Sequence, residues 1–148
     1  MEEKFMKEAL KEAKKAYEKQ EVPVGAVIVK DGKIIARAHN LREIKQCATA
    51  HAEILAIEKA SKKLNSWRLI DCDMYVTLEP CTMCMGAIIS SRIKNLYIGA
   101  LDQKTGACGS FVDLNTLKYN HTVNISKGML AKDCEYIIKD FFKILRKK

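Results

Sequence analysis

Two cysteines in the middle of the chain have the spacing of metal ligands. Cys81 and Cys84 lie in the segment Pro80-Cys81-Thr-Met-Cys84, so at the start of a helix both thiols would share one face. The positive end of a helix dipole lowers the pKa of a thiol and favours the thiolate, which is the form that binds metal. The same spacing occurs in thioredoxin-like redox pairs and by chance, so a third ligand must decide between these interpretations.

His51 is the candidate for that third ligand. It lies at the start of another predicted helix, and cysteine and histidine are the donors that zinc prefers. Three protein ligands leave one position for water, which is the arrangement of catalytic zinc sites. His39, His121 or Cys47 could instead supply a fourth ligand and close the site as a structural one. We expect the open, catalytic arrangement.

Glu53, two residues after His51, is expected to point toward the core. At about 100° per residue, the apolar side chains of its helix occupy one arc, and Glu53 falls inside that arc. The arc consists of Ile54, Ala56, Ile57, Ala60 and Leu64. A carboxylate buried without a partner is strongly destabilising or stays protonated, whereas beside a metal-bound water it can shuttle protons. The alternative is an N-terminal glutamate that only complements the helix dipole.

Helices and strands alternate along the chain and must position these residues. Hydrophobic periodicity and turn signals predict helices over residues 2–19, 49–64, 81–91 and 130–145, with Thr49 as a cap and Pro80 at a helix start. They predict strands over residues 24–29, 33–38, 74–78, 95–100 and 123–125, an Asp31-Gly32 hairpin turn, and a loop over residues 102–110. Helices between successive strands indicate an α/β layered fold with parallel later strands. No repeat or linker interrupts this pattern, so residues 1–148 are expected to form one domain.

The composition excludes several classes of protein. Hydrophobic residues make up 48% of the 148 residues, which excludes disorder for the bulk of the chain. No apolar stretch is long enough to span a membrane, and the first 15 residues are too charged for a signal peptide. We therefore expect a soluble, cytoplasmic protein without a membrane partner. In that reducing compartment the four isolated cysteines are expected to be free and buried. They are Cys47, Cys72, Cys108 and Cys134.

The C-terminal ten residues concentrate positive charge. Of the net charge of +8, half lies in residues 139–148, which hold five cations and one acidic residue, Asp140. The five are Lys139, Lys143, Arg146, Lys147 and Lys148. A basic tail suggests a polyanionic partner. The alternative is a solvated helix end whose cations complement the negative end of the dipole.

The segments His51-Ala-Glu53 and Pro80-Cys81-Thr-Met-Cys84 together resemble the signature of zinc-dependent nucleobase and nucleoside deaminases. That signature is shared by a whole superfamily and does not choose the base. Nearly the whole chain resembles the bacterial tRNA-specific adenosine deaminases, and the loop over residues 104–110 and the Phe141-Phe142 basic ending point to this family in particular. Other similar segments are residues 22–27, 50–54, 78–81, 91–93 and 130–134.

The resemblance implies a fold, a cofactor and a reaction. The fold would be the cytidine-deaminase-like three-layer α/β/α sandwich with a central five-stranded mixed sheet. One Zn²⁺ per chain would be held by His51, Cys81 and Cys84, and its bound water would attack carbon 6 of the wobble adenosine in a tRNA anticodon loop. Glu53 would carry protons, and the products would be inosine and ammonia.

The resemblance also implies residues that contact the substrate. Asn40 would hydrogen-bond the purine, although from the residues alone it reads as a turn residue that ends a strand. Further contacts are expected from Ala52, Asp102, Lys104, Phe142 and Arg146. Apolar side chains surround the predicted helix over residues 82–89, so one core face cannot cover them all, and the resemblance implies a homodimer. They are Met83, Met85, Ala87, Ile88 and Ile89.

Two other functions compete with this one. A zinc deaminase of free guanine, cytosine or deoxycytidylate would share every catalytic residue. A basic surface and exposed loop residues such as Asp102 and Lys104 would favour RNA, whereas a closed pocket would favour one small molecule. A non-enzymatic RNA-binding zinc module is the other alternative, and both Glu53 in the apolar arc and the count of three ligands argue against it.

Overall fold

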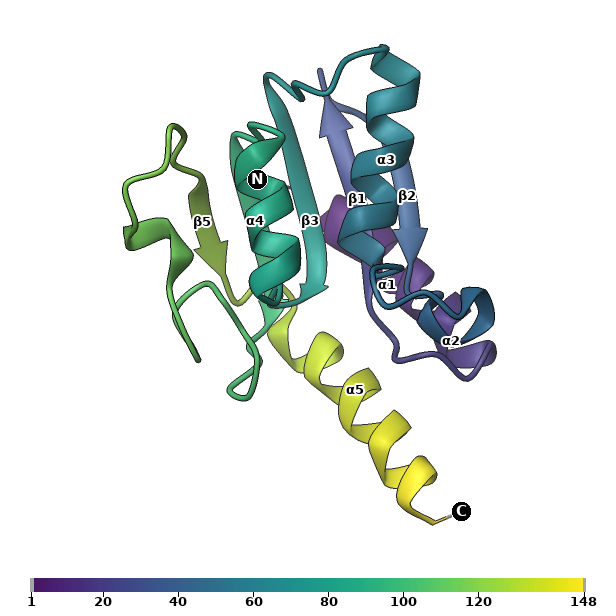
Figure 1. Ribbon diagram of the computed structural model, residues 1–148. Helices are drawn as coiled ribbons and strands as arrows, with labels where there is room; N and C mark the ends of the chain where they lie inside the picture. Colours follow the sequence, from purple (N-terminus) through teal and green to yellow (C-terminus); the bar gives the residue numbers. More distant parts are fainter. Residues whose placement is uncertain (1, 148) are drawn as a thin grey trace.

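A computed structural model describes residues 2–147 as a five-stranded sheet between two layers of helices (Figure 1). The helices are α1 (Glu3–Glu18), α2 (Arg42–Lys45), α3 (Ala52–Leu64), α4 (Thr82–Ser90) and α5 (Ala131–Arg146), with a 3-10 helix over Leu114–Thr116. The strands are β1 (Gly25–Lys30), β2 (Lys33–His39), β3 (Cys72–Leu78), β4 (Asn95–Ala100) and β5 (Asn124–Lys127). The predicted three-layer α/β/α fold is confirmed.

The sheet is mixed, and its strand order is β2-β1-β3-β4-β5. Strand β1 is antiparallel to both β2 and β3, whereas β3, β4 and β5 run parallel to one another, as expected for the later strands. The hairpin between β1 and β2 turns through Asp31 and Gly32, which both have positive φ, as the tight turn of a hairpin requires. The carboxyl ends of β3 and β4 therefore meet at one edge of the sheet.

The two faces of the sheet carry separate hydrophobic cores. Helices α3 and α4 cover one face and α1 and α5 cover the other (Figure 1). Along β1 the side chains alternate, so Ile28 packs beneath α3 and α4, whereas Val27 packs with Phe5 and Tyr75 on the opposite face. Burial on both faces explains why the central strands read as continuous apolar runs.

Helices α3 and α4 begin later than the sequence predicted. His51, not Thr49, is the N-cap of α3, and Cys81 is the N-cap of α4, so Pro80 lies outside that helix. The Asn40 side chain accepts a hydrogen bond from the Ala52 N–H at 2.8 Å and so satisfies the first turn of α3 without a cap from within the segment. As a result, two of the predicted metal ligands occupy the N-cap positions of facing helices.

Two further predictions need correction or extension. Cys47 is exposed, because the segment between β2 and α3 runs over the surface, whereas Cys72, Cys108 and Cys134 are buried as expected. The short helix α2 and the 3-10 helix were not predicted.

Helix α5 packs on β4 through Cys134 and then projects beyond the sheet (Figure 1). Within residues 2–147, no helix has both the length and the apolar character needed to cross a membrane.

Candidate active site

His51, Cys81 and Cys84 converge at the edge where β3 ends. The His51 Nδ1 atom lies 3.8 Å from the Cys81 Sγ atom and 3.5 Å from the Cys84 Sγ atom, and the three donor atoms lie within 4.8 Å of one another. Donors at 2.0–2.3 Å from a tetrahedral ion are roughly 3.5–3.8 Å apart. The three side chains therefore fit a single tetrahedral metal ion with one position left over.

The electrostatics of the site favour a thiolate. The Cys84 side chain hydrogen-bonds Cys81 and, together with His51, lowers the pKa of Cys81 to about 4 despite partial burial. That same hydrogen bond and burial raise the pKa of Cys84. Both helix N-termini direct positive dipole ends at the site, which stabilises the charge of a thiolate. The Cys81 sulfur is therefore a thiolate at neutral pH, which is the form that binds metal.

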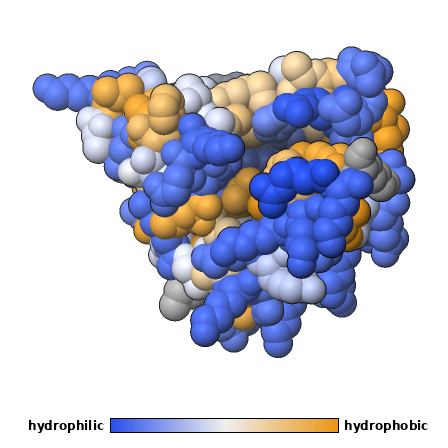
Figure 2. Space-filling model, turned by 90° about the horizontal axis from the view of Figure 1, so that it is seen from below, coloured by the Kyte–Doolittle hydropathy of each residue, from blue (hydrophilic) through white to orange (hydrophobic). Residues whose placement is uncertain are grey.

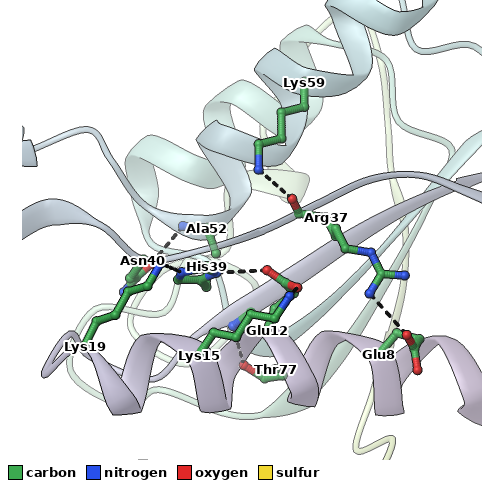
Figure 3. Close-up of polar contacts among 11 residues, drawn as sticks. Glu8, Glu12, Lys15, Lys19, Arg37, His39, Asn40, Ala52, Lys59 and Thr77 are labelled. Atoms are coloured by element: carbon green, nitrogen blue, oxygen red, sulfur yellow. Dashed lines mark hydrogen bonds and ion pairs between the residues drawn. The ribbon is translucent and has the colours of Figure 1, made fainter. Parts of the chain in front are cut away.

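The structure gives no fourth protein ligand among residues 2–147. His39 lies on the other side of β2, where its Nδ1 atom contacts Glu12 at 2.8 Å and its Nε2 atom contacts Lys19 at 3.0 Å (Figure 3). His121 contacts the Ile93 carbonyl through Nε2, and the Cys47 thiol pairs with Thr49. Of the described residues, only His51, Cys81 and Cys84 form a group that could hold a metal ion. The described residues therefore do not form the four-ligand site of a structural zinc.

Glu53 is buried beside the three donors, as helical periodicity predicted. Only 4% of the residue is exposed, and burial raises the pKa of its carboxyl to about 7. It belongs to the lining of the same cavity as His51 and Cys81. A carboxyl with a pKa near neutrality can both accept and release a proton, which suits general acid–base catalysis.

A cavity of about 460 Å³ covers this group. Its lining includes Gln20, Glu21, Val22, Val24, Asn40, Arg42, Glu43, His51, Glu53, Leu78, Glu79, Cys81, Asp102, Thr105, Phe141, Phe142 and Leu145. A volume of this order is typical of sites for small organic ligands. Figure 2 shows the end of the molecule at which β3 terminates, where the surface is mostly hydrophilic with smaller hydrophobic areas.

Asn40 lies on the cavity wall, and its orientation is fixed. Its side-chain oxygen accepts from the Ala52 N–H (Figure 3). Its backbone N–H donates to the Val24 carbonyl at 3.2 Å. Because an N–H group can pair only with the amide oxygen, the Asn40 NH2 group remains available as a donor. Ala52 itself is fully buried, and its N–H donates to the Asn40 side chain.

The remaining predicted contacts are distributed unevenly. Asp102 and Phe142 line the cavity, whereas Lys104 and Arg146 are exposed and lie outside its lining. The Asp102 carboxylate accepts hydrogen bonds from the backbone of Lys104 and from Thr105, so it shapes its own loop. Lys148, one of the five tail cations, lies outside the described residues.

Several lining residues were missed by the sequence analysis, notably Glu21, Glu79 and Phe141. Glu21 is buried, and its carboxylate accepts from the backbone of Glu43 and Ile44, which fixes α2 at the cavity wall. Glu79 is also buried. Burial opposes its ionisation, but the Ser110 hydroxyl and three backbone N–H groups outweigh burial and lower the pKa of Glu79. No spacing rule marks either residue, because their partners lie far along the chain.

Comparison with known proteins identifies a family and several relatives. The family model described as MafB19-like deaminase matches residues 1–146. A tRNA-specific adenosine deaminase of Bacillus subtilis (strain 168) is 51% identical over 145 residues, which cover 97% of this chain and 90% of the relative.

Solved structures show the same relationship. A structure from biochemical and structural studies of A-to-I editing by tRNA:A34 deaminases at the wobble position of transfer RNA has a TM-score of 0.87 and 44% identity, covering 90% of this chain and 98% of that one. A guanine deaminase from Bacillus subtilis has a TM-score of 0.66 and 33% identity, covering 100% of this chain and 95% of that one.

Proposed function

Because the chain belongs to the MafB19-like deaminase family and to the tRNA-specific adenosine deaminases, we propose that it converts the wobble adenosine of a tRNA anticodon to inosine. The reaction is hydrolytic: one water is consumed, the 6-amino group leaves as ammonia, and an oxygen takes its place. The observation that carries this function is the open set of three metal donors beside the buried carboxyl of Glu53.

The proposed cofactor is one Zn²⁺ per chain, held by His51, Cys81 and Cys84. The donor set supports zinc, because one imidazole and two thiols are its preferred ligands and their separations suit tetrahedral binding. When bound, zinc lowers the pKa of a water molecule to about 7 and so supplies a nucleophile at neutral pH. The N-termini of α3 and α4 keep the donors in place.

Glu53 performs the proton transfers. Its carboxylate takes a proton from the attacking water and delivers it to ring nitrogen 1 of adenine as carbon 6 is attacked. The second proton then passes through the same carboxyl to the departing amine, so the group ends the cycle in the state in which it began. Burial supports this role, because a carboxyl with a pKa near 7 exchanges protons readily in both directions.

Asn40 and the cavity walls position the base. The free NH2 group of Asn40 donates to an acceptor on the purine, and Phe142 on α5 supplies apolar contact at the cavity wall. Asp102 contributes through the shape of its loop. Lys104 and Arg146, which lie outside the cavity, would contact the RNA on either side of the base that enters it.

The exposed cations of α5 favour RNA over a free nucleoside. Lys139, Lys143, Arg146 and Lys147 are on or next to the end of α5 that borders the cavity through Phe141, Phe142 and Leu145. An anticodon loop is single-stranded and can present an unstacked base without opening a duplex. Each phosphate contact would release a counterion and add affinity.

A deaminase of free guanine is the second candidate, because a guanine deaminase shares 33% identity with this chain. The tRNA-specific relative is more similar, at 51%, and a pocket for one free base has no use for the cations of α5. A free base is therefore the less favoured substrate.

The proposal extends to the state of the protein in the cell. Residues 1–148 would act as one deaminase domain in the cytoplasm, where tRNA is available.

A homodimer is proposed because apolar side chains are exposed on α4 and on the nearby segment. They are Met83, Phe111 and Leu117, whereas Met85, Ile88 and Ile89 are buried. Sedimentation should show twice the 16.7 kDa chain mass at micromolar concentration, and a monomer alone would refute the dimer.

The function is tested by incubating total tRNA with the zinc-loaded protein and sequencing it. Inosine should appear at position 34 of adenosine-containing anticodons and nowhere else in those molecules. Unchanged tRNA, combined with deamination of free guanine, would assign the protein to the second candidate.

A further inference from the structure

Glu79 lies between the metal ligands and the loop over residues 102–110. It follows the last residue of β3 and precedes Pro80 and Cys81, and only 2% of it is exposed. Its carboxylate accepts four hydrogen bonds from that loop. The donors are the backbone N–H groups of Asp102, Cys108 and Ser110 and the Ser110 hydroxyl.

The loop closes tightly around this carboxylate. A Cβ atom on Gly106 would approach the Glu79 carboxyl carbon to 2.3 Å, so only glycine fits at that position. The loop is also tied internally, because the Asp102 carboxylate accepts from Lys104 and Thr105. A loop with its own internal bonds behaves as one unit. The Glu79 carboxylate joins this unit to the end of β3 through four bonds, alongside the backbone bond from the Ala107 N–H to the Pro80 carbonyl at 2.8 Å.

We infer that Glu79 is a positioning residue that fixes the loop over residues 102–110 against the segment carrying Cys81, and thereby sets the RNA-facing wall of the cavity. The inference rests on the proposed function for its RNA-binding consequence. Asp102 and Thr105 line the cavity from this loop, while Cys81 lines it from the segment on the other side of Glu79. Glu79 also borders the cavity, but both of its carboxylate oxygens are bonded to the loop, so it links the substrate wall to the metal site.

The variant Glu79→Gln breaks this link with little change in volume. An amide offers one oxygen, so in either orientation its NH2 group faces at least one backbone N–H: that of Asp102, or those of Cys108 and Ser110. A backbone N–H that loses its acceptor opens to solvent more often. We expect hydrogen–deuterium exchange at residues 102–110 to be at least about tenfold faster in the zinc-loaded variant.

The second readout separates RNA binding from chemistry. The dissociation constant for an anticodon stem-loop should rise about tenfold with zinc content unchanged, and kcat should change by less than the dissociation constant, because the metal donors and Glu53 are not altered. The matched control is Thr77→Val, which removes another buried hydrogen bond, from the Gly25 N–H to Thr77 Oγ1, outside the cavity lining (Figure 3). It should lower thermal stability and leave both readouts at wild-type values.

Ser110→Ala provides a milder test if Glu79→Gln does not fold. It removes the hydroxyl donor and keeps the backbone bonds, so a smaller acceleration of exchange in the same loop is expected. Exchange rates within twofold of wild type in either folded variant would overturn the inference, as would faster exchange with unchanged RNA affinity. If wild-type protein neither binds nor deaminates the stem-loop, the proposed function fails, whereas the exchange data still decide whether Glu79 fixes the loop.

Discussion

The metal site and the C-terminal half of α5 border the same cavity but differ in their exposure to solvent. Around the metal site the groups are enclosed: Cys84 is fully buried, Glu53 is 4% exposed, and His51 and Cys81 stand at the N-caps of helices packed on the sheet. Along α5 the side chains open to solvent, with Leu145 52% exposed. Chemistry and affinity therefore reside in regions that substitutions can separate.

The difference follows from what each task requires. Proton transfer needs donor and acceptor within hydrogen-bond distance, so the groups that carry it must be held by packing and backbone bonds. Phosphate contacts are individually weak, tolerant of geometry and dependent on salt. Substitutions at the metal site should therefore have large effects on catalysis and little effect on RNA binding. Substitutions of the α5 cations should have small effects on RNA binding and none on catalysis.

The largest effect is expected from Cys84→Ala. Loss of one of three donors should reduce zinc from about one ion per chain to near zero and deamination to background, as metal analysis and an inosine assay would show. Cys134→Ala is the control, because Cys134 is equally buried but lies on α5 against the opposite face of the sheet. Full zinc retention with normal turnover in Cys84→Ala would refute the assigned ligand set.

The next effect, Glu53→Gln, separates metal binding from chemistry. The amide keeps the size of the side chain but cannot carry protons, so kcat should fall by roughly 10² to 10⁴ while zinc content and RNA affinity are retained. Glu12→Gln is the matched control, since Glu12 is a buried carboxylate that pairs with His39 and Lys15 away from the cavity. Activity of Glu53→Gln within a few-fold of wild type would exclude the proton-transfer role.

Asn40→Asp should have an intermediate effect. The carboxylate still accepts from the Ala52 N–H, which preserves the start of α3, but it lacks the NH2 donor proposed for the purine. The loss of one hydrogen bond to substrate predicts a decrease in kcat/KM of about tenfold, with zinc content unchanged. Wild-type kinetics in this variant would mean that Asn40 only caps α3.

The smallest effect is expected at the end of α5. Deleting residues 146–148 should weaken binding to an anticodon stem-loop and flatten its salt dependence, by up to about 0.7 in the slope of log K against log salt for each lost contact. Zinc content and kcat should stay unchanged. Superimposable salt titrations of truncated and full-length protein would show that these cations only solvate the helix end.

The same contrast explains which features could be predicted from sequence. Ligand spacing and the burial of Glu53 follow from helical geometry within a few residues, and parallel pairing of β3 and β4 follows from the helix between them. The bonds from Glu79 to Asp102, Cys108 and Ser110 span 23–31 residues and follow no period, so only the folded chain reveals them.

Errors in the local predictions have similar causes. Thr49 has the chemistry of a cap, but Asn40 at the end of β2 satisfies the Ala52 N–H from outside the segment. Cys47 was expected to be buried because isolated cysteines usually are, yet its segment crosses the surface before α3. Helix α2 has four residues, which is too short for an apolar period to identify.

The most direct test of the account is a competition between substrates. Zinc-loaded protein would be offered an adenosine-containing anticodon stem-loop alongside free adenosine, guanine and cytosine at equal concentration, and each product would be quantified by mass spectrometry. We predict inosine at the wobble position of the stem-loop and little or no conversion of the free compounds. Faster turnover of any free base or nucleoside than of the stem-loop would contradict the assignment of RNA as the substrate.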